Sequence, residues 1–142
     1  MKRTGTLTVL LYFIIIFITS SCTSVFPNDQ LDYMWRLDKI YDINSKEEKE
    51  IEHVWFCFAR DLIEICDNTP HGPVGVISDY GDSLKIDYSM YTESTTYDTA
   101  SLLKILRECG ISSLTTTFII EKLDSGKMIL ADKDFRLYLT RW

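Results

Sequence analysis

Apolar and polar residues alternate through the last part of the chain, from Thr115 to Trp142. Turn-forming residues, Asp-Ser-Gly at 124–126 and Asp-Lys-Asp at 132–134, interrupt the alternation twice. The pattern therefore predicts three antiparallel strands in succession. A turn at 133–134 sets Leu130 opposite Leu137 on an inward face. A meander with one buried face needs further strands to cover it, and the preceding residues supply them.

Two hairpins with the same period of two precede this meander. Their strands are predicted at 51–58 and 62–66, and at 74–80 and 83–90, with two-residue turns at 60–61 and 81–82. The pairs that these turns set opposite each other on the inward face are Phe58 with Ile63 and Ile77 with Ile86.

A further strand is predicted at residues 32–41, before the first hairpin. Trp35 and Ile40 fall on opposite parities, so we expect a bulge near Asp38. Leu123 breaks the alternation in the same way near Gly126, where a bulged hairpin is expected. The charged stretch 42–50 that follows the first strand is interpreted as a solvated loop.

Between residues 91 and 114 the period changes from two to 3.6. Leu102, Leu106 and Cys109 lie on one apolar stripe, which predicts a short amphipathic helix over 100–109. Asp98 or Thr99 is the expected N-cap, and Gly110 is the expected left-handed residue after the helix.

These elements predict an all-β domain with one short helix, spanning residues 32–142. Eight antiparallel strands in up-and-down order close into a barrel when the last strand pairs with the first, and the helix then lies between the fifth and sixth strands. Closure brings Arg141 beside Trp35, where its guanidinium is expected to stack on the indole. The alternative is an open sheet curled around a helix that belongs to the core.

In such a barrel the short turns lie at one end and the long connections at the other. The helix is expected to cover the end with the long connections, which is the mouth. Such a barrel is either filled by its own side chains or holds one small ligand, and both outcomes stay open. The side chains predicted to line the mouth are Val54, Ile65, Tyr88, Met90 and Phe118.

The N-terminus has the pattern of an export signal. Lys2 and Arg3 precede an uncharged run from Leu7 to Ile18, which is shorter than the roughly 20 residues that a spanning helix needs. Small residues then lead to Cys22, so residues 1–21 are predicted to be removed. An ordinary secretory signal cleaved near this point is the alternative.

Thr19 to Cys22 resembles the lipobox of bacterial lipoproteins, whose Cys becomes the acylated N-terminus. This resemblance implies a lipid on Cys22, a linker over 22–31 and a periplasm-facing position at the outer membrane. The barrel pattern resembles the lipocalins, and more closely the lipocalin-like lipoproteins of the Bacteroides type. In these relatives a Trp on the first strand packs with an Arg on the last, which implies a closing role for Trp35 and Arg141.

The charge and the cysteine content reduce the number of possible function classes further. Without residues 1–21 the chain keeps 13 basic and 21 acidic residues, a net charge of −8, which argues against nucleic-acid binding. The remaining cysteines are Cys57, Cys66 and Cys109, an odd number, and their spacing gives no zinc motif. In the predicted register Cys57 and Cys66 are diagonal neighbours about 7–8 Å apart, beyond comfortable disulfide reach.

The sequence therefore predicts a binding protein for a small hydrophobic or amphipathic molecule, without cofactor or metal. The alternative is an envelope interaction module with a filled barrel, which docks through Trp55, Val76 and Tyr138 on its exterior. An enzyme is not expected, because His53 points outward, His71 lies in a loop, and no catalytic motif is present.

Overall fold

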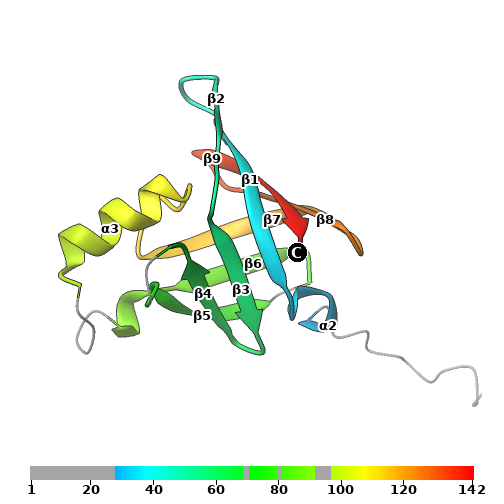
Figure 1. The fold of residues 1–142 in the computed structure, drawn as a ribbon, viewed down its shortest axis with the longest axis horizontal. Helices are drawn as coiled ribbons and strands as arrows, with labels where there is room; N and C mark the ends of the chain where they lie inside the picture. Colours follow the sequence, from blue (N-terminus) through cyan, green and yellow to red (C-terminus); the bar gives the residue numbers. More distant parts are fainter. Residues whose placement is uncertain (1–27, 69–70, 80, 92–96) are drawn as a thin grey trace, which may run out of the picture.

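The computed structural model of the chain describes residues 28–68, 71–79, 81–91 and 97–142. Within these residues, nine strands form one antiparallel sheet, accompanied by short helices (Figure 1). The helices are α2 (Asn28–Leu31), the 3-10 helix η1 (Ser89–Tyr91) and α3 (Thr99–Glu108). The strands are β1 (Met34–Asp42), β2 (Glu47–Glu50), β3 (Trp55–Ala59), β4 (Leu62–Cys66), β5 (Val74–Asp79), β6 (Ser83–Asp87), β7 (Thr115–Leu123), β8 (Lys127–Ala131) and β9 (Phe135–Arg141).

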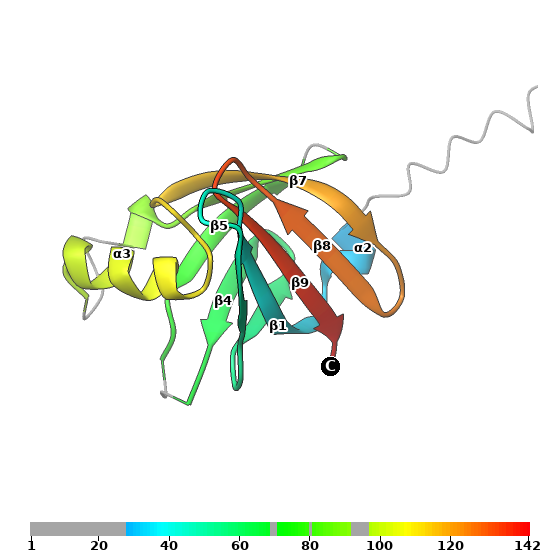
Figure 2. The ribbon, with the colours of Figure 1, turned by 90° about the horizontal axis from the view of Figure 1, so that it is seen from above.

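The first and last strands pair and close the sheet into a barrel. The β1–β9 ladder runs from Trp35 opposite Arg141 to Asp42 opposite Phe135, and Figure 2 shows the two strands side by side. The closed ring consists of β1 and β3 to β9, with α3 between β6 and β7. The predicted eight-stranded barrel is therefore confirmed, and the open sheet curled around the helix is wrong.

The predicted hairpin registers are also confirmed. The structure pairs Phe58 with Ile63, Ile77 with Ile86 and Leu130 with Leu137. Alternation fixes these registers because a slip of one residue would turn every apolar side chain outward. A register shift lies at Asp38, as expected, whereas the shift in β7 lies at Glu121 rather than near Gly126.

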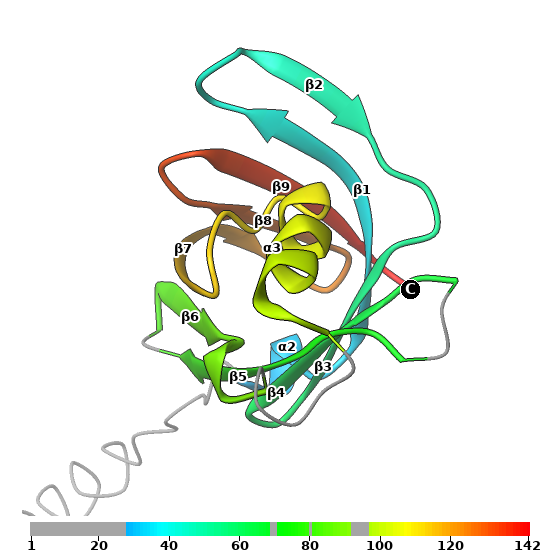
Figure 3. The ribbon, with the colours of Figure 1, turned by 90° about the vertical axis from the view of Figure 1, so that its left-hand side faces the viewer.

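The charged stretch predicted as a loop contains a strand. Residues Glu47–Glu50 form β2, which pairs with residues 39–42 in the second half of β1. Residues 34–36 at the start of β1 pair with β3 instead. Residues 51–54 form the bend between β2 and β3, with His53 at φ +61°, so the predicted strand over 51–58 is shorter than expected. All four β2 residues are exposed, which removes the alternation that reveals a strand. The β1–β2 hairpin projects beyond the barrel (Figures 1 and 3).

The buried core begins at the end of the barrel where the short turns lie. Trp35 is fully buried at that end, and its indole Nε1 donates a hydrogen bond to the carbonyl oxygen of Leu31 at 3.2 Å. Leu31 is itself only 1% exposed. The packed domain therefore begins with α2, a few residues before the predicted boundary at 32.

The helix α3 begins and ends as the sequence predicts. The Asp98 carboxylate caps its first turn by accepting hydrogen bonds from the Ser101 amide and hydroxyl, both at 2.9 Å. At its end Gly110 adopts φ +78°, and the Ile111 amide donates to the Leu106 carbonyl at 2.8 Å. The helix buries Leu102 and Leu106 and covers the barrel end with the long connections (Figure 3).

We expect Gly110→Ala to destabilise the protein more than Gly81→Ala. Both glycines have positive φ, which costs an L side chain about 1–2 kcal/mol. A Cβ at Gly110 would lie 2.3 Å from Leu137 Cδ2, whereas nothing lies within 4 Å of a Cβ at Gly81. The overpacking adds about 1–3 kcal/mol for Gly110→Ala alone. Urea unfolding measures both variants, and equal losses would contradict this placement of α3.

Candidate functional site

The closed end of the barrel is built from Trp35, Arg141 and Tyr33. Arg141 lies opposite Trp35 in the β1–β9 ladder, as predicted. However, its guanidinium lies over the ring of Tyr33, with the Arg141 Cζ 3.2 Å from the ring centroid. The expected stacking on the indole is therefore wrong: Tyr33 is the aromatic partner of Arg141, and the Trp35 indole is fully buried with its Nε1 on the Leu31 carbonyl. The cation–π contact between Arg141 and Tyr33 therefore lies on the outside of this closed end of the barrel.

The mouth residues predicted from the sequence separate into three groups. Ile65 and Tyr88 are buried near the ends of β4 and β6 that face the long connections, and Val54 packs against the same core. Phe118 is buried deeper, because its strand partner is Leu84 near the start of β6. Met90 is 70% exposed on η1, so its inward assignment is wrong: the strand ends at Asp87 and the period of two ends with it.

The Tyr88 hydroxyl is a polar group within the apolar interior near the mouth of the barrel. The side chain is fully buried, and its hydroxyl has no hydrogen-bond partner among the described residues. Its ring packs on Gly75, where a Cβ would lie 3.0 Å from the Tyr88 Cε1. Burial raises the pKa of Tyr88, and the nearby Cys109 thiol raises it further, so the phenol keeps its proton. The hydroxyl is therefore a hydrogen-bond donor.

Cys109 at the end of α3 joins Tyr88 in this region, although the sequence did not single it out as a site residue. It is 5% exposed, and burial, followed by the charge of Asp67, raises the pKa of its thiol to about 12. Its position on the apolar stripe of the helix was the signal that could have revealed it. The region under α3 thus offers a phenol and a neutral thiol among apolar side chains, which suits a neutral molecule better than an ion.

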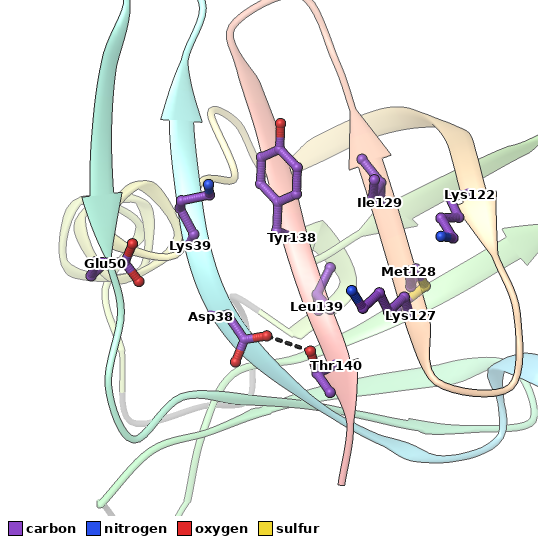
Figure 4. A pocket seen from close by; sticks show the side chains of 10 residues that line it. All are labelled: Asp38, Lys39, Glu50, Lys122, Lys127, Met128, Ile129, Tyr138, Leu139 and Thr140. Carbon is purple, nitrogen blue, oxygen red and sulfur yellow. Dashed lines mark hydrogen bonds between the residues drawn. The ribbon is translucent and has the colours of Figure 1, made fainter.

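A hollow of about 430 Å³ lies on the outer face of β1, β9, β8 and β7 (Figure 4). Lys39 in this hollow lies 4.6 Å from the Tyr138 ring centroid and pairs with Glu48 at 3.0 Å. Asp38 accepts hydrogen bonds from Arg36 at 2.6 Å and from Thr140 at 2.5 Å. Lys39 and Asp38 are thus already paired with protein groups of opposite charge, which makes these two residues poorly suited to hold an ionic ligand.

A second outer hollow, of about 480 Å³, lies across the Asp38 bulge from the first and is more aromatic. Trp142 is 69% exposed, and its ring meets the Trp55 ring edge-on at 5.8 Å. The Trp55 Nε1 is buried without a hydrogen-bond partner among the described residues. Of the residues predicted for exterior docking, Trp55, Val76 and Tyr138 do point outward, and all three are half-buried.

The cysteine pair on the outer face of β3 and β4 differs from expectation. Cys57 lies opposite Glu64 and Cys66 opposite Trp55, so the two are diagonal neighbours as predicted. Their Sγ atoms are nevertheless only 2.8 Å apart. The prediction that they lie beyond disulfide reach is therefore wrong, because it assumed a flat ladder, whereas strand twist shortens one diagonal.

The described residues show no metal site and no cluster of histidines. No three His, Cys, Asp or Glu side chains among them come together as a metal site. His53 is exposed beside Trp55, and His71 is exposed in the loop before β5, where its carbonyl accepts a hydrogen bond from Tyr97 at 2.9 Å. Among residues 28–68, 71–79, 81–91 and 97–142, no helix is long and apolar enough to cross a membrane.

The barrel and its covering helix define a lipocalin-like protein. A family model described as a lipocalin-like domain matches residues 16–142, and the chain belongs to this family. A comparison with curated proteins gives no match.

Solved structures share the fold. The chain is similar to a lipocalin-like protein from Bacteroides uniformis, with a TM-score of 0.61 and 14% identity, over 80% of this chain and 99% of the other. It is also similar to an uncharacterized protein from Bacteroides eggerthii, with a TM-score of 0.60 and 18% identity, over 78% and 98% of the two chains. The predicted family resemblance is confirmed.

A double-mutant cycle tests the aromatic partner of Arg141. We expect Arg141→Gln and Tyr33→Leu to couple by about 0.5–1 kcal/mol, as for an exposed cation–π contact. Arg141→Gln and Trp35→Phe should show almost no coupling, because the indole contacts Leu31 instead. Urea unfolding of the single and double variants gives both values, and a larger coupling with Trp35 would refute the arrangement at this end.

Proposed function

We propose that this lipocalin-like protein binds a small apolar molecule that carries one neutral hydrogen-bond acceptor, such as a ketone or an ester. The molecule binds in the barrel beneath α3, with its acceptor on the Tyr88 hydroxyl. The observation that supports this proposal is the buried phenol that lacks a partner among the described residues.

An unpartnered buried hydroxyl is costly. Leaving a buried donor without an acceptor costs about 1–3 kcal/mol, and most buried polar groups in proteins are therefore satisfied. A ligand acceptor would recover much of this free energy, whereas a hydrocarbon of the same size would not. Apolar side chains of the same core, such as Ile86, which lies beside the Tyr88 ring at Gly75, would accept the rest of the molecule. An eight-stranded barrel has room for one small ligand when its side chains do not meet.

We also propose that the protein is exported and held at the outer membrane by a lipid on Cys22, facing the periplasm. The support is the sequence of residues 1–22, which lies outside the described residues. Asn28, the first residue of α2, belongs to the end of the barrel opposite α3. A tether on Cys22 would therefore reach the sealed end and leave the mouth turned away from the membrane.

An interaction module with a filled barrel is the second candidate function. The observation that favours it is the aromatic hollow at Trp55 and Trp142, where a buried indole nitrogen has no described partner. Native mass spectrometry of the protein extracted from its own envelope separates the candidates. A retained small molecule supports ligand binding, whereas a bare chain that co-purifies with a stoichiometric protein, and loses it on Trp142→Ala, supports docking.

We expect Tyr88→Phe to weaken binding of an acceptor-bearing ligand selectively. Decan-2-one should bind about tenfold more weakly to the variant, because one hydrogen bond worth about 1.4 kcal/mol is lost. Undecane should bind equally well to both proteins. Quenching or shift of tryptophan fluorescence in titrations measures the affinities, and an equal change for both probes would exclude Tyr88 as the donor.

Replacing the predicted lipid attachment site should release the protein from membranes. We expect Cys22→Ser to move the protein from the detergent phase to the aqueous phase in Triton X-114 partition of whole cells, because the acyl chains supply the membrane affinity. Cys109→Ser, which alters a buried thiol inside the barrel, is the matched control and should stay in the detergent phase. Unchanged partition of a Cys22→Ser variant that has lost residues 1–21 would rule out the anchor.

A further inference from the structure

The β3–β4 hairpin carries two cysteines whose sulfur atoms almost touch. Cys57 and Cys66 lie on the outer face, on neighbouring antiparallel strands, with their Sγ atoms 2.8 Å apart. Both residues are half-buried rather than enclosed in the core. Cys109 is buried inside the barrel under α3, on the other side of the sheet. The three thiols within the described residues therefore divide into a pair and a single residue.

The spacing of the pair does not suit a shared metal ion. Two thiolates on a tetrahedral zinc ion, with bonds of about 2.3 Å, stand about 3.8 Å apart. The observed 2.8 Å is closer to the bond length of a disulfide, about 2.05 Å, than to that separation. Asp, Glu and His side chains that could complete a metal site with these two sulfurs do not gather there within the described residues.

We propose that Cys57 and Cys66 are a disulfide-forming site, at which a covalent bond joins β3 to β4 on the outer face of the barrel. In the folded chain the two sulfur atoms already lie close to bonding distance. Each sulfur has to move by less than an ångström for the S–S bond to form. Export, which is a separate proposal, would place the pair where such bonds persist.

The reaction needs a disulfide as oxidant, such as an exported thiol oxidase in the cell or oxidised glutathione in vitro. One protein thiolate attacks a sulfur of the oxidant, forms a mixed disulfide and releases one thiol. The second protein thiolate attacks the first cysteine sulfur and releases the other thiol. The protein thus loses two electrons and two protons, and the oxidant disulfide is reduced to two thiols.

The surroundings of the pair bear on how the bond forms and on what it would hold together. Burial, and then the hydrogen bond with Cys66, raise the pKa of the Cys57 thiol to about 12. The Cys57 thiol therefore keeps its proton at neutral pH, and it must lose this proton before its sulfur can attack a disulfide. The bond would also hold together a hairpin that is attached to β1 and to β5 by ladders of only three residue pairs each.

The test uses the full-length protein extracted from its own envelope under acid, then denatured and alkylated before any reduction. We expect peptide mass spectrometry to find Cys57 linked to Cys66 and Cys109 alkylated. Purified reduced protein incubated with oxidised glutathione should form the same link. Alkylation of both Cys57 and Cys66 before reduction, or glutathione adducts on both after the incubation, would overturn the proposal.

Variants supply the matched controls. Cys109→Ser should keep the link, whereas Cys57→Ser should instead carry glutathione on Cys66. Reduction with a phosphine should lower the melting temperature of the wild type by roughly 8–15 °C, as expected for a short closed loop. The double variant Cys57→Ser, Cys66→Ser should show no such change on reduction. If the link is absent while this double variant folds normally, the pair is simply two packed thiols.

Discussion

The hydrogen bonds between β1 and β9 are the constraint on which the rest of the structure depends. Without them the sheet would have two open borders, and Leu37, Ile40 and Leu139 would lose the facing wall that buries them. Because the ring is closed, the inward side chains of all eight strands face one shared interior. The two ends then need different solutions: α2 and Trp35 seal one, and the apolar face of α3 covers the other.

The covered end differs chemically from the sealed end. At the sealed end the indole of Trp35 has its hydrogen-bond acceptor within the chain, and the neighbouring Arg141 lies on Tyr33. Under α3 the hydroxyl of Tyr88 has no acceptor among the described residues, and Cys109 contributes a second weak donor. The indole at the sealed end is thus satisfied within the chain, whereas the hydroxyl under α3 is left with an unused hydrogen-bond donor.

Much of this architecture could be predicted from the sequence. Period-two alternation and turn residues fixed the registers at Ile63, Ile86 and Leu137, and the N-cap and glycine fixed α3. The rest depends on three-dimensional features that leave no periodic pattern of apolar and polar residues in the sequence. β2 has no buried side to reveal it, Met90 lies beyond the end of its strand, and strand twist brings Cys57 and Cys66 together. Of the site, Tyr88 was predictable by parity, but its unpartnered hydroxyl was not.

The projecting hairpin has a consequence for how copies of the protein behave beside one another. Within the described residues β2 pairs only with β1, so its other side presents unpaired backbone groups to solvent. Such a border invites a second chain to extend the sheet. Its side chains are Glu47, Glu48, Lys49 and Glu50, all exposed, and their crowded negative charge makes the approach of an identical border unfavourable. The acidic run thus keeps neighbouring molecules apart and works against fibre-like assembly.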